Sequence, residues 1–324
     1  MIGFVYKNTC HPVSQHYANA LGAVPIRIRC PISALWKGLI TPTYDSYFIE
    51  SVMSMLVPIT KRMLGEKITI VFRGNDGLFG EKTQAYLWTT NILKRKILLW
   101  FIKHMDAIIV ESEMAKKDAQ QWTSVPIKVC ESYIEHKKAL EKIKPPLKTK
   151  TFLFIGEYRP PYDHKNIEPL IALFNSMPEY SLIIIGKNTA QLKNKANKNI
   201  TILDFVQNIT EYYTQATYYI HLPTYETGPI TLLEAMTAGL VVITNNNAGH
   251  SIIIKNVSRE LIVEENTLDN IKKHIKKIAA MSFKEKQKIS ETFKNIGKNH
   301  YSKEEMTEKF RKVWKSLIVQ YKQS

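Results

Sequence analysis

The sequence predicts two doubly wound α/β domains in tandem, and three features of the 324-residue chain support this. Short aliphatic and β-branched runs alternate with helical stretches, which is typical of a parallel sheet with helices on both faces. This alternation occurs twice, once before residue 136 and again from Thr151 onward. Between the two series, residues 136–150 are rich in lysine and contain Pro145-Pro146, a composition that favours a linker.

The elements follow from hydrophobic periodicity and turn residues. The first series opens with a strand over 2–6 and a helix that ends at Leu21, with Ser14 as its expected N-cap. Further strands are expected at 26–30, 45–49, 68–72, 106–110 and 127–130, and in the second series at 151–155, 182–185, 200–203, 218–222 and 240–244. We therefore expect domains over residues 1–145 and 146–302, followed by a C-terminal helix in 303–324.

Composition limits the class of protein. Hydrophobic residues make up 44% of the chain and aromatic residues 10%, which indicates a folded protein rather than a disordered one. The longest apolar runs fall well short of the ~20 residues that span a bilayer, and we expect no cleavable signal peptide. Cys10, Cys30 and Cys130 have no C-x-x-C spacing, so we expect a reducing, cytoplasmic setting and no metal knuckle.

The net charge of +16 indicates an anionic partner. Nucleic acid, nucleotide diphosphates and anionic membrane surfaces each suit a basic protein, and composition alone does not choose among them.

The most informative stretch runs from Thr224 to Asn247, TYETGPITLLEAMTAGLVVITNNN. It predicts a loop, a helix that closes at Gly239, and a buried parallel strand. The first backbone N–H groups of a helix have no helical partner, so residues 228–231 form a seat for phosphate. Glu226 lies before this seat and Glu234 about two turns into the helix. Two carboxylates beside an anion seat suit a ligand whose phosphate carries sugar hydroxyls.

This stretch resembles the E-x7-E signature of retaining GT-B glycosyltransferases of family 4. The resemblance implies that Glu226 meets the donor sugar and that Glu234 holds the nucleotide ribose. It implies that the diphosphate lies against the backbone of Gly228, Pro229, Ile230 and Thr231. The implied fold is GT-B, two Rossmann-like domains that face each other across a cleft, with a C-terminal helix that crosses back to the first domain.

A second match to the family is the run FLFIGEYRPPYDHKN that opens the second series. The family usually places an arginine directly after the strand-ending glycine, here Gly156, and a lysine some residues later. Lys165 fits the lysine, whereas Glu157 stands at the arginine position. Arg159, two residues on, is the candidate substitute for binding the diphosphate.

The first series departs further from the family. The usual glycine pair after the first strand is absent, and Arg73 stands where a catalytic histidine is common. A cation there suits charge that develops on the leaving diphosphate, and Asp76 could orient an acceptor hydroxyl. The alternative interpretation is that Arg73 and Asp76 form a structural ion pair.

The segment ILKRKILLWFIK, residues 92–103, also has two interpretations. Its basic and aromatic residues are typical of a helix that lies on an anionic membrane surface. The same pattern is typical of a helix that packs one apolar face on its sheet, and this second interpretation is favoured.

The resemblance implies an enzyme, a retaining hexosyltransferase that uses a nucleotide-diphosphate sugar, UDP- or GDP-linked, and a saccharide or lipid-linked acceptor. The chain has no D-x-D motif, so we expect no metal and no cofactor. Peripheral contact with an anionic membrane is a further expectation, and nucleic acid binding is not expected. The remaining alternatives are a GT-B epimerase, a non-catalytic family member and a basic nucleic-acid-binding protein.

Overall fold

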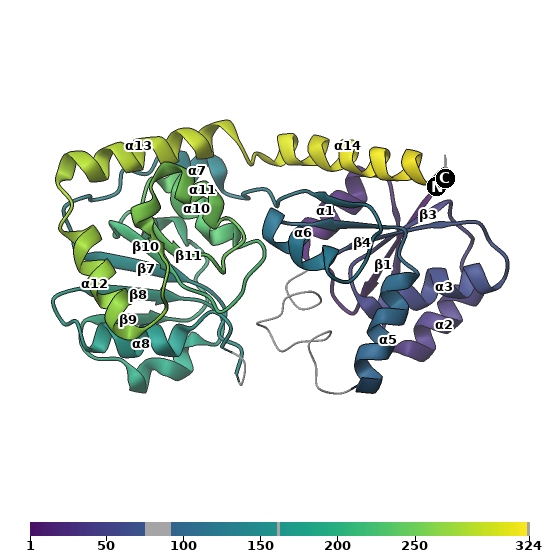
Figure 1. Ribbon diagram of the computed structural model, residues 1–324, viewed down its shortest axis with the longest axis horizontal. Coiled ribbons are helices and arrows are strands. Elements are labelled where there is room, and N and C mark those ends of the chain that lie inside the picture. The colour runs from purple at the N-terminus through teal and green to yellow at the C-terminus, as the bar shows by residue number, and fades with distance from the viewer. Residues whose placement is uncertain (75–91, 161–162, 323–324) are drawn as a thin grey trace. The chain divides into compact units, whose positions relative to one another are not determined.

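The computed structural model describes residues 1–74, 92–160 and 163–322 (Figure 1). The chain forms two compact units, one of Met1–Tyr133 with Lys303–Ser324 and one of Ile134–Ser302. Each unit contains one six-stranded sheet, and every strand pair in the described part of the chain is parallel. The doubly wound α/β architecture predicted from the alternation of strands and helices is confirmed.

The first unit has the sheet order β2-β1-β3-β4-β5-β6. Helices follow the strands because a parallel strand pair requires a crossover connection. In chain order the elements are β1 (Ile2–Lys7), α1 (Pro12–Ala20), β2 (Val24–Ile28), α2 (Pro31–Ile40), β3 (Ser46–Ile49), the 3-10 helix η1 (Val52–Met55), α3 (Leu56–Met63), β4 (Thr69–Arg73), α5 (Ile92–Lys103), β5 (Ala107–Val110), α6 (Glu113–Gln120), β6 (Ile127–Val129) and α14 (Lys303–Lys322).

The C-terminal helix α14 packs into the first unit through aromatic residues. Phe310 stacks on Tyr17 of α1 with ring centroids 4.2 Å apart, and Trp314 meets Phe48 of β3 edge-on at 5.7 Å. All four side chains are buried, and such aromatic pairs stabilise packing beyond the area that they bury. His16 Nε2 lies 2.7 Å from Thr307 Oγ1, so this histidine also joins α1 to α14.

The second unit has the sheet order β12-β11-β10-β7-β8-β9. Its core combines the strands with apolar faces of the surrounding helices, all in one buried cluster. The elements are α7 (Lys137–Glu141), β7 (Thr151–Ile155), α8 (Ile167–Asn175), β8 (Ser181–Ile185), η4 (Thr189–Lys195), β9 (Ile200–Leu203), α9 (Thr210–Tyr213), β10 (Tyr218–His221), α10 (Ile230–Ala238), β11 (Val241–Asn245), α11 (Ser251–Val257), η5 (Arg259–Leu261), β12 (Ile262–Val263), α12 (Leu268–Ala279) and α13 (Phe283–Asn299).

Three details differ from the sequence prediction. The first helix begins at Pro12 with His11 as N-cap, so Ser14 lies inside the helix and not at its cap. The sequence analysis assigned no helix at seven of the observed helices, which are α2, α3, α7, α8, α11, α12 and α13. The division between the units falls at Tyr133 and Ile134, before the residue 145 that composition suggested, because Leu140 of α7 is buried in the second core.

Helix α5 packs as the favoured interpretation expected. Leu98, Phe101 and Ile102 belong to the core of the first unit. Ile97 and Trp100 remain exposed, as do Arg95, Lys96 and Lys103. The helix therefore contributes one face to the core and a second, mixed face to the surface.

Candidate donor-binding site

The candidate site lies where the strand order of the second sheet reverses. β7 pairs with β8 on one side and with β10 on the other. Loops from the carboxyl ends of such strands leave the sheet in opposite directions, and ligands of open α/β sheets bind at this point. Two of the predicted residues follow these strands, Lys165 after β7 and Glu226 after β10.

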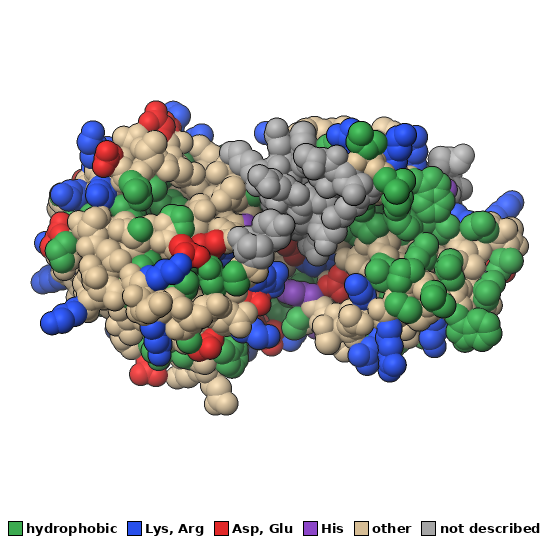
Figure 2. All heavy atoms as spheres, turned by 90° about the horizontal axis from the view of Figure 1, so that it is seen from below, with side chains coloured by type: hydrophobic (Ala, Val, Ile, Leu, Met, Phe, Trp, Pro, Cys, Tyr) green, Lys and Arg blue, Asp and Glu red, His purple; other side chains and the backbone are tan. Residues whose placement is uncertain are grey.

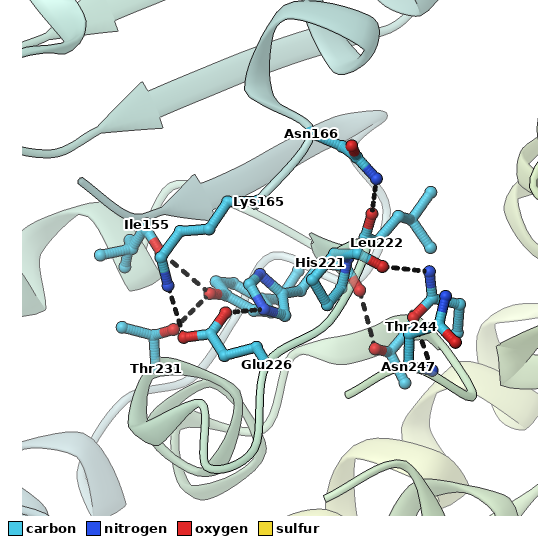
Figure 3. A network of polar contacts seen from close by, with 12 residues as sticks. Ile155, Lys165, Asn166, His221, Leu222, Glu226, Thr231, Thr244 and Asn247 are labelled. Atoms are coloured by element: carbon cyan, nitrogen blue, oxygen red, sulfur yellow. Dashed lines mark hydrogen bonds and ion pairs between the residues drawn. The ribbon is translucent and has the colours of Figure 1, made fainter. Parts of the chain in front are cut away.

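The loop that carries Glu226 is tied to the end of β11. The Glu226 amide donates to Asn247 O at 3.0 Å, and Gly249 N donates to Glu226 O at 2.8 Å. Asn245 Nδ2 donates to Pro223 O at 2.9 Å, and Thr244 Oγ1 donates to His221 O at 2.7 Å. These bonds fix the backbone on both sides of the carboxylate (Figure 3).

The Glu226 side chain is a buried anion, 8% exposed, held by two partners. Lys165 Nζ donates to Oε1, and His221 Nε2 lies 2.6 Å from Oε2 (Figure 3). Burial alone raises the pKa of a carboxyl group, but Lys165 and His221 favour the ionised form more strongly. The pKa of Glu226 therefore lies well below its usual range.

Lys165 is positioned by the loop between β7 and α8. The next residue, Asn166, has a left-handed backbone with φ 56°, and its Nδ2 donates to Leu222 O at 2.7 Å. Thr224 Oγ1 donates to Asn166 Oδ1 at 3.0 Å, which joins this loop to the Glu226 loop. The Lys165 stem passes Gly156, where an added Cβ would lie 2.8 Å from Lys165 Cδ. A larger residue at position 156 would therefore displace the Lys165 stem.

The N-terminus of α10 lies directly after the loop that carries Glu226. Helix α10 begins at Ile230, with Pro229 as its N-cap, and no described side chain caps it. The first amides of the helix are therefore open to an anion. Thr231 in the first turn is fixed by Tyr219, whose hydroxyl lies 2.7 Å from Thr231 Oγ1.

Glu234 lies one turn beyond Thr231, so both side chains are on one face of α10. The buried Tyr213 hydroxyl donates to Glu234 Oε2 at 3.0 Å. Burial raises the pKa of Glu234, and the bond from Tyr213 opposes this only in part. Glu226 and Glu234 therefore have opposite shifts, although they are only eight residues apart.

Arg159, the expected substitute for the family arginine, is exposed and pairs with Glu157 at 2.6 Å. Glu157 and Arg159, the first and third residues after Gly156, thus neutralise each other in this structure. Binding of a diphosphate by Arg159 stays a prediction.

Arg73 lies in the first unit and is 5% exposed. It forms an ion pair with Glu111, and its NH groups lie 3.1 Å from Ser14 Oγ and 3.3 Å from Ser132 Oγ. This burial favours the structural interpretation of Arg73, and Glu111 is a partner that the sequence did not indicate. Asp76 lies outside the described residues.

His221 is the site residue that sequence reasoning missed. It is the last residue of β10, one position before the end of the predicted strand 218–222, and it is completely buried where an apolar residue would be ordinary. Its signal in the sequence was a single histidine in an apolar run, five positions before Glu226. Within the described ranges, the structure shows no cluster of three or more His, Cys, Asp or Glu side chains that could hold a metal.

Comparison with known proteins defines the class. The sequence profile of the family Glycosyl transferases group 1 matches residues 135–299, just over half of the chain, and the chain belongs to this family. It is a glycosyltransferase, and its two parallel six-stranded sheets form the GT-B fold. No curated protein sequence matches the chain.

Solved structures show the same fold at low sequence identity. The Anabaena protein Alr3699/HepE in complex with UDP is similar with a TM-score of 0.76 and 10% identity, over 97% of this chain and 99% of that chain. A glycosyltransferase from Rickettsia africae ESF-5 is similar with a TM-score of 0.69 and 14% identity, over 98% of both chains. The structure described as trehalose-6-phosphate from E. coli bound with UDP-2-fluoro glucose is similar with a TM-score of 0.71 and 11% identity, over 98% of both chains.

Proposed function

We propose that the second unit binds a nucleotide-diphosphate sugar, UDP- or GDP-linked, and that the enzyme transfers its hexose with retention to a saccharide or a lipid-linked acceptor. The observation that carries this proposal is the buried Glu226 carboxylate, held by Lys165 and His221 beside the N-terminus of α10, which no described side chain caps. The helix N-terminus and the Lys165 ammonium can bind the diphosphate, and the Glu226 carboxylate can accept hydrogen bonds from the sugar hydroxyls. Solved structures with the same fold contain UDP and UDP-glucose, which supports this class of donor.

The proposed roles follow from charge and position. The backbone N–H groups of Gly228, Ile230 and Thr231 at the start of α10 and the Lys165 ammonium face the diphosphate. Glu226 accepts from donor-sugar hydroxyls. Glu234, on the same face of α10 as Thr231, accepts from the ribose hydroxyls. Arg159 joins the diphosphate only if it leaves Glu157.

In the proposed reaction, the bond between the anomeric carbon and the diphosphate oxygen breaks, and the electron pair leaves with the nucleoside diphosphate. The acceptor hydroxyl oxygen forms the new bond on the same face, and its proton passes to the leaving phosphate. Lys165 and the positive end of α10 stabilise the departing charge, which is greater in the transition state than in the donor. Since these groups supply the positive charge, we propose that the transfer requires neither a metal nor a cofactor.

The decisive experiment is a thermal-shift and donor-hydrolysis screen with UDP-, GDP-, ADP- and CDP-sugars. One nucleotide class should stabilise the protein by about 2.7 kcal/mol at a hundredfold excess over its Kd. The anomeric configuration of the transferred sugar, read by NMR, tests retention. Release of an epimerised sugar without transfer would favour the epimerase alternative, and absence of binding to every nucleotide would contradict the proposal.

We also propose that the first unit contacts an anionic membrane surface. Helices α2 and α3 pack together, and both contact η1. Helix α5 also contacts η1, and Figure 1 shows it beside α2 and α3. Figure 2 shows hydrophobic side chains gathered on this unit. The exposed apolar residues on the three helices, named here the apolar face, are Ile32, Leu35, Trp36, Leu39, Ile40, Met63, Ile92, Leu93, Ile97 and Trp100.

Charge supports an anionic membrane as the partner of the apolar face. Helices α2, α3 and α5 contain no aspartate or glutamate, whereas Arg95, Lys96 and Lys103 are exposed on α5. A second copy of the same chain would bring like charges together, while an anionic bilayer offers both apolar and negative groups. Each basic residue near such a surface contributes about 1 kcal/mol. No helix in the described part of the chain is long and apolar enough to cross a bilayer.

Cosedimentation with vesicles tests this contact. Wild-type protein should bind phosphatidylglycerol-containing vesicles at low salt and not pure phosphatidylcholine vesicles. Replacement of Ile32, Trp36 and Leu39 by serine, or of Arg95 and Lys96 by glutamate, should abolish binding. Glutamate at the exposed Lys193 and Lys198 of the second unit makes the same charge change and should leave binding intact. A concentration-dependent dimer, lost in the serine variant, would instead identify the apolar face as a contact between two copies.

A further inference from the structure

The two oxygens of Glu226 have partners of different kinds. His221 Nε2, 2.6 Å from Oε2, belongs to a completely buried imidazole at the end of β10. Because a carboxylate only accepts hydrogen bonds, Nε2 carries the hydrogen of this contact. The ring stacks on Phe154 of β7 at 5.8 Å and on Tyr219 at 6.3 Å, so its orientation is fixed by strand packing.

Among the described residues, Glu226 is the only hydrogen-bond partner of the His221 ring. Nδ1 is buried and has no hydrogen-bond partner among the described residues. A buried polar atom without a partner is unfavourable, and a smaller or apolar side chain would avoid that cost. The contact with Oε2 is therefore the polar interaction that histidine provides at this position.

Lys165 holds Oε1 in a different manner. Its side chain is 15% exposed and extends from a loop on a flexible four-carbon stem. A diphosphate seated at α10 would compete with Glu226 for this ammonium. The buried His221 has no comparable route to another partner.

We propose that His221 is the positioning residue of the donor site. It keeps Glu226 Oε2 in place while Lys165 moves from Oε1 to the donor diphosphate, so that Oε1 becomes available to a sugar hydroxyl. This inference rests on the proposed donor chemistry, and it divides the carboxylate into a fixed oxygen and an exchangeable one.

Two variants at position 221 separate positioning from packing. His221→Phe keeps an aromatic ring against Phe154 and Tyr219 but removes the N–H. His221→Gln has an amide nitrogen near the position of Nε2 and restores a donor to Glu226. The turnover of the donor should fall at least tenfold in His221→Phe and recover to within about fivefold of wild type in His221→Gln. The KM for the donor and the affinity for free nucleotide should stay within about twofold.

A second readout needs no donor. The Glu226 carboxyl group, followed by carbon-13 NMR, should titrate at higher pH in His221→Phe than in wild type or in His221→Gln. Wild-type turnover in His221→Phe, or identical titration in all three proteins, would overturn the role of His221. Failure of wild-type protein to bind any nucleotide would contradict the proposed function, and the titration would still decide whether His221 positions Glu226.

Discussion

Replacement of Lys165 by methionine tests the electrostatics of the site in the absence of any ligand. Methionine keeps most of the apolar stem over Gly156 and removes the charge that faces Glu226. Removal of one partner of a buried ion pair costs about 3–5 kcal/mol. Since His221 remains bonded to Oε2 and Lys165 is partly exposed, we expect a loss of about 2–4 kcal/mol at pH 7.

The pH dependence of this loss is the sharper result. The depressed pKa of Glu226 contributes stability that is complete above the unfolded pKa, about 4.3, and is lost as pH falls toward the folded pKa. In wild type this loss approaches about 1.4 kcal/mol per pH unit below the unfolded pKa, and it amounts to about 1.8 kcal/mol between pH 7 and pH 3. The unfolding free energy of Lys165→Met should depend much less on pH in this range. The difference in unfolding free energy between wild type and Lys165→Met should therefore be smaller at pH 3 than at pH 7 by about 1.8 kcal/mol.

Urea unfolding at pH 7 and pH 3, followed by a probe in the second unit, measures both values. Lys195→Met is the matched control, because it removes the same charge from an exposed pair with Glu168. Exposed pairs contribute about 0–1 kcal/mol, so the control should change little at either pH. A loss below about 0.5 kcal/mol in Lys165→Met, or a loss that is equal at both pH values, would refute the reasoning.

Three further predictions concern the same unit. Glu234→Ala should weaken nucleotide-diphosphate binding by about 1.5–3 kcal/mol in calorimetry, and an unchanged affinity for every nucleotide would contradict the ribose role. Because burial raises the pKa of Glu234, wild-type affinity should also decline as pH falls through that raised value and the carboxylate is lost. Glu226→Gln should bind free UDP or GDP nearly as wild type while turnover collapses. Equal loss of nucleotide binding in Glu226→Gln and Glu234→Ala would contradict this division of roles between the two glutamates. Gly186→Ala should unfold at a markedly lower temperature, because the added Cβ would overlap the carbonyl oxygen of Gly156, and an unchanged midpoint would show that β7 and β8 separate easily.

Local patterns in the sequence determined much of the architecture. Short apolar runs such as 151–155 and 241–245 are strands because they bury on both faces of a parallel sheet, and their length and composition indicate this without any partner. Gly239, with φ 83°, ends α10 where the sequence placed the turn, because this backbone conformation favours glycine. The loop, helix and strand around Glu226 and Glu234 were predicted for the same reason, since each signal lies within a few residues of its effect.

Contacts between distant segments could not be predicted in this way. α2 has apolar residues on its exposed surface as well as in the core, so its sequence lacks the amphipathic period that identifies a helix. The partners of Arg73, which are Glu111, Ser14 and Ser132, come from distant parts of the chain and could not be predicted from the sequence.

The site shows the same division between sequence and tertiary structure. Lys165, His221 and Glu226 were present in the sequence as a lysine, a strand histidine and a loop glutamate. Their common ion-pair network exists because β7 and β10 are neighbours in the sheet, although more than sixty residues separate their first residues along the chain. The pKa of Glu226 depends on burial and on the distance to two charged or polar partners, which only the tertiary structure decides. Residue types and spacing determined which groups the chain could offer to a ligand, and strand pairing determined which of them meet.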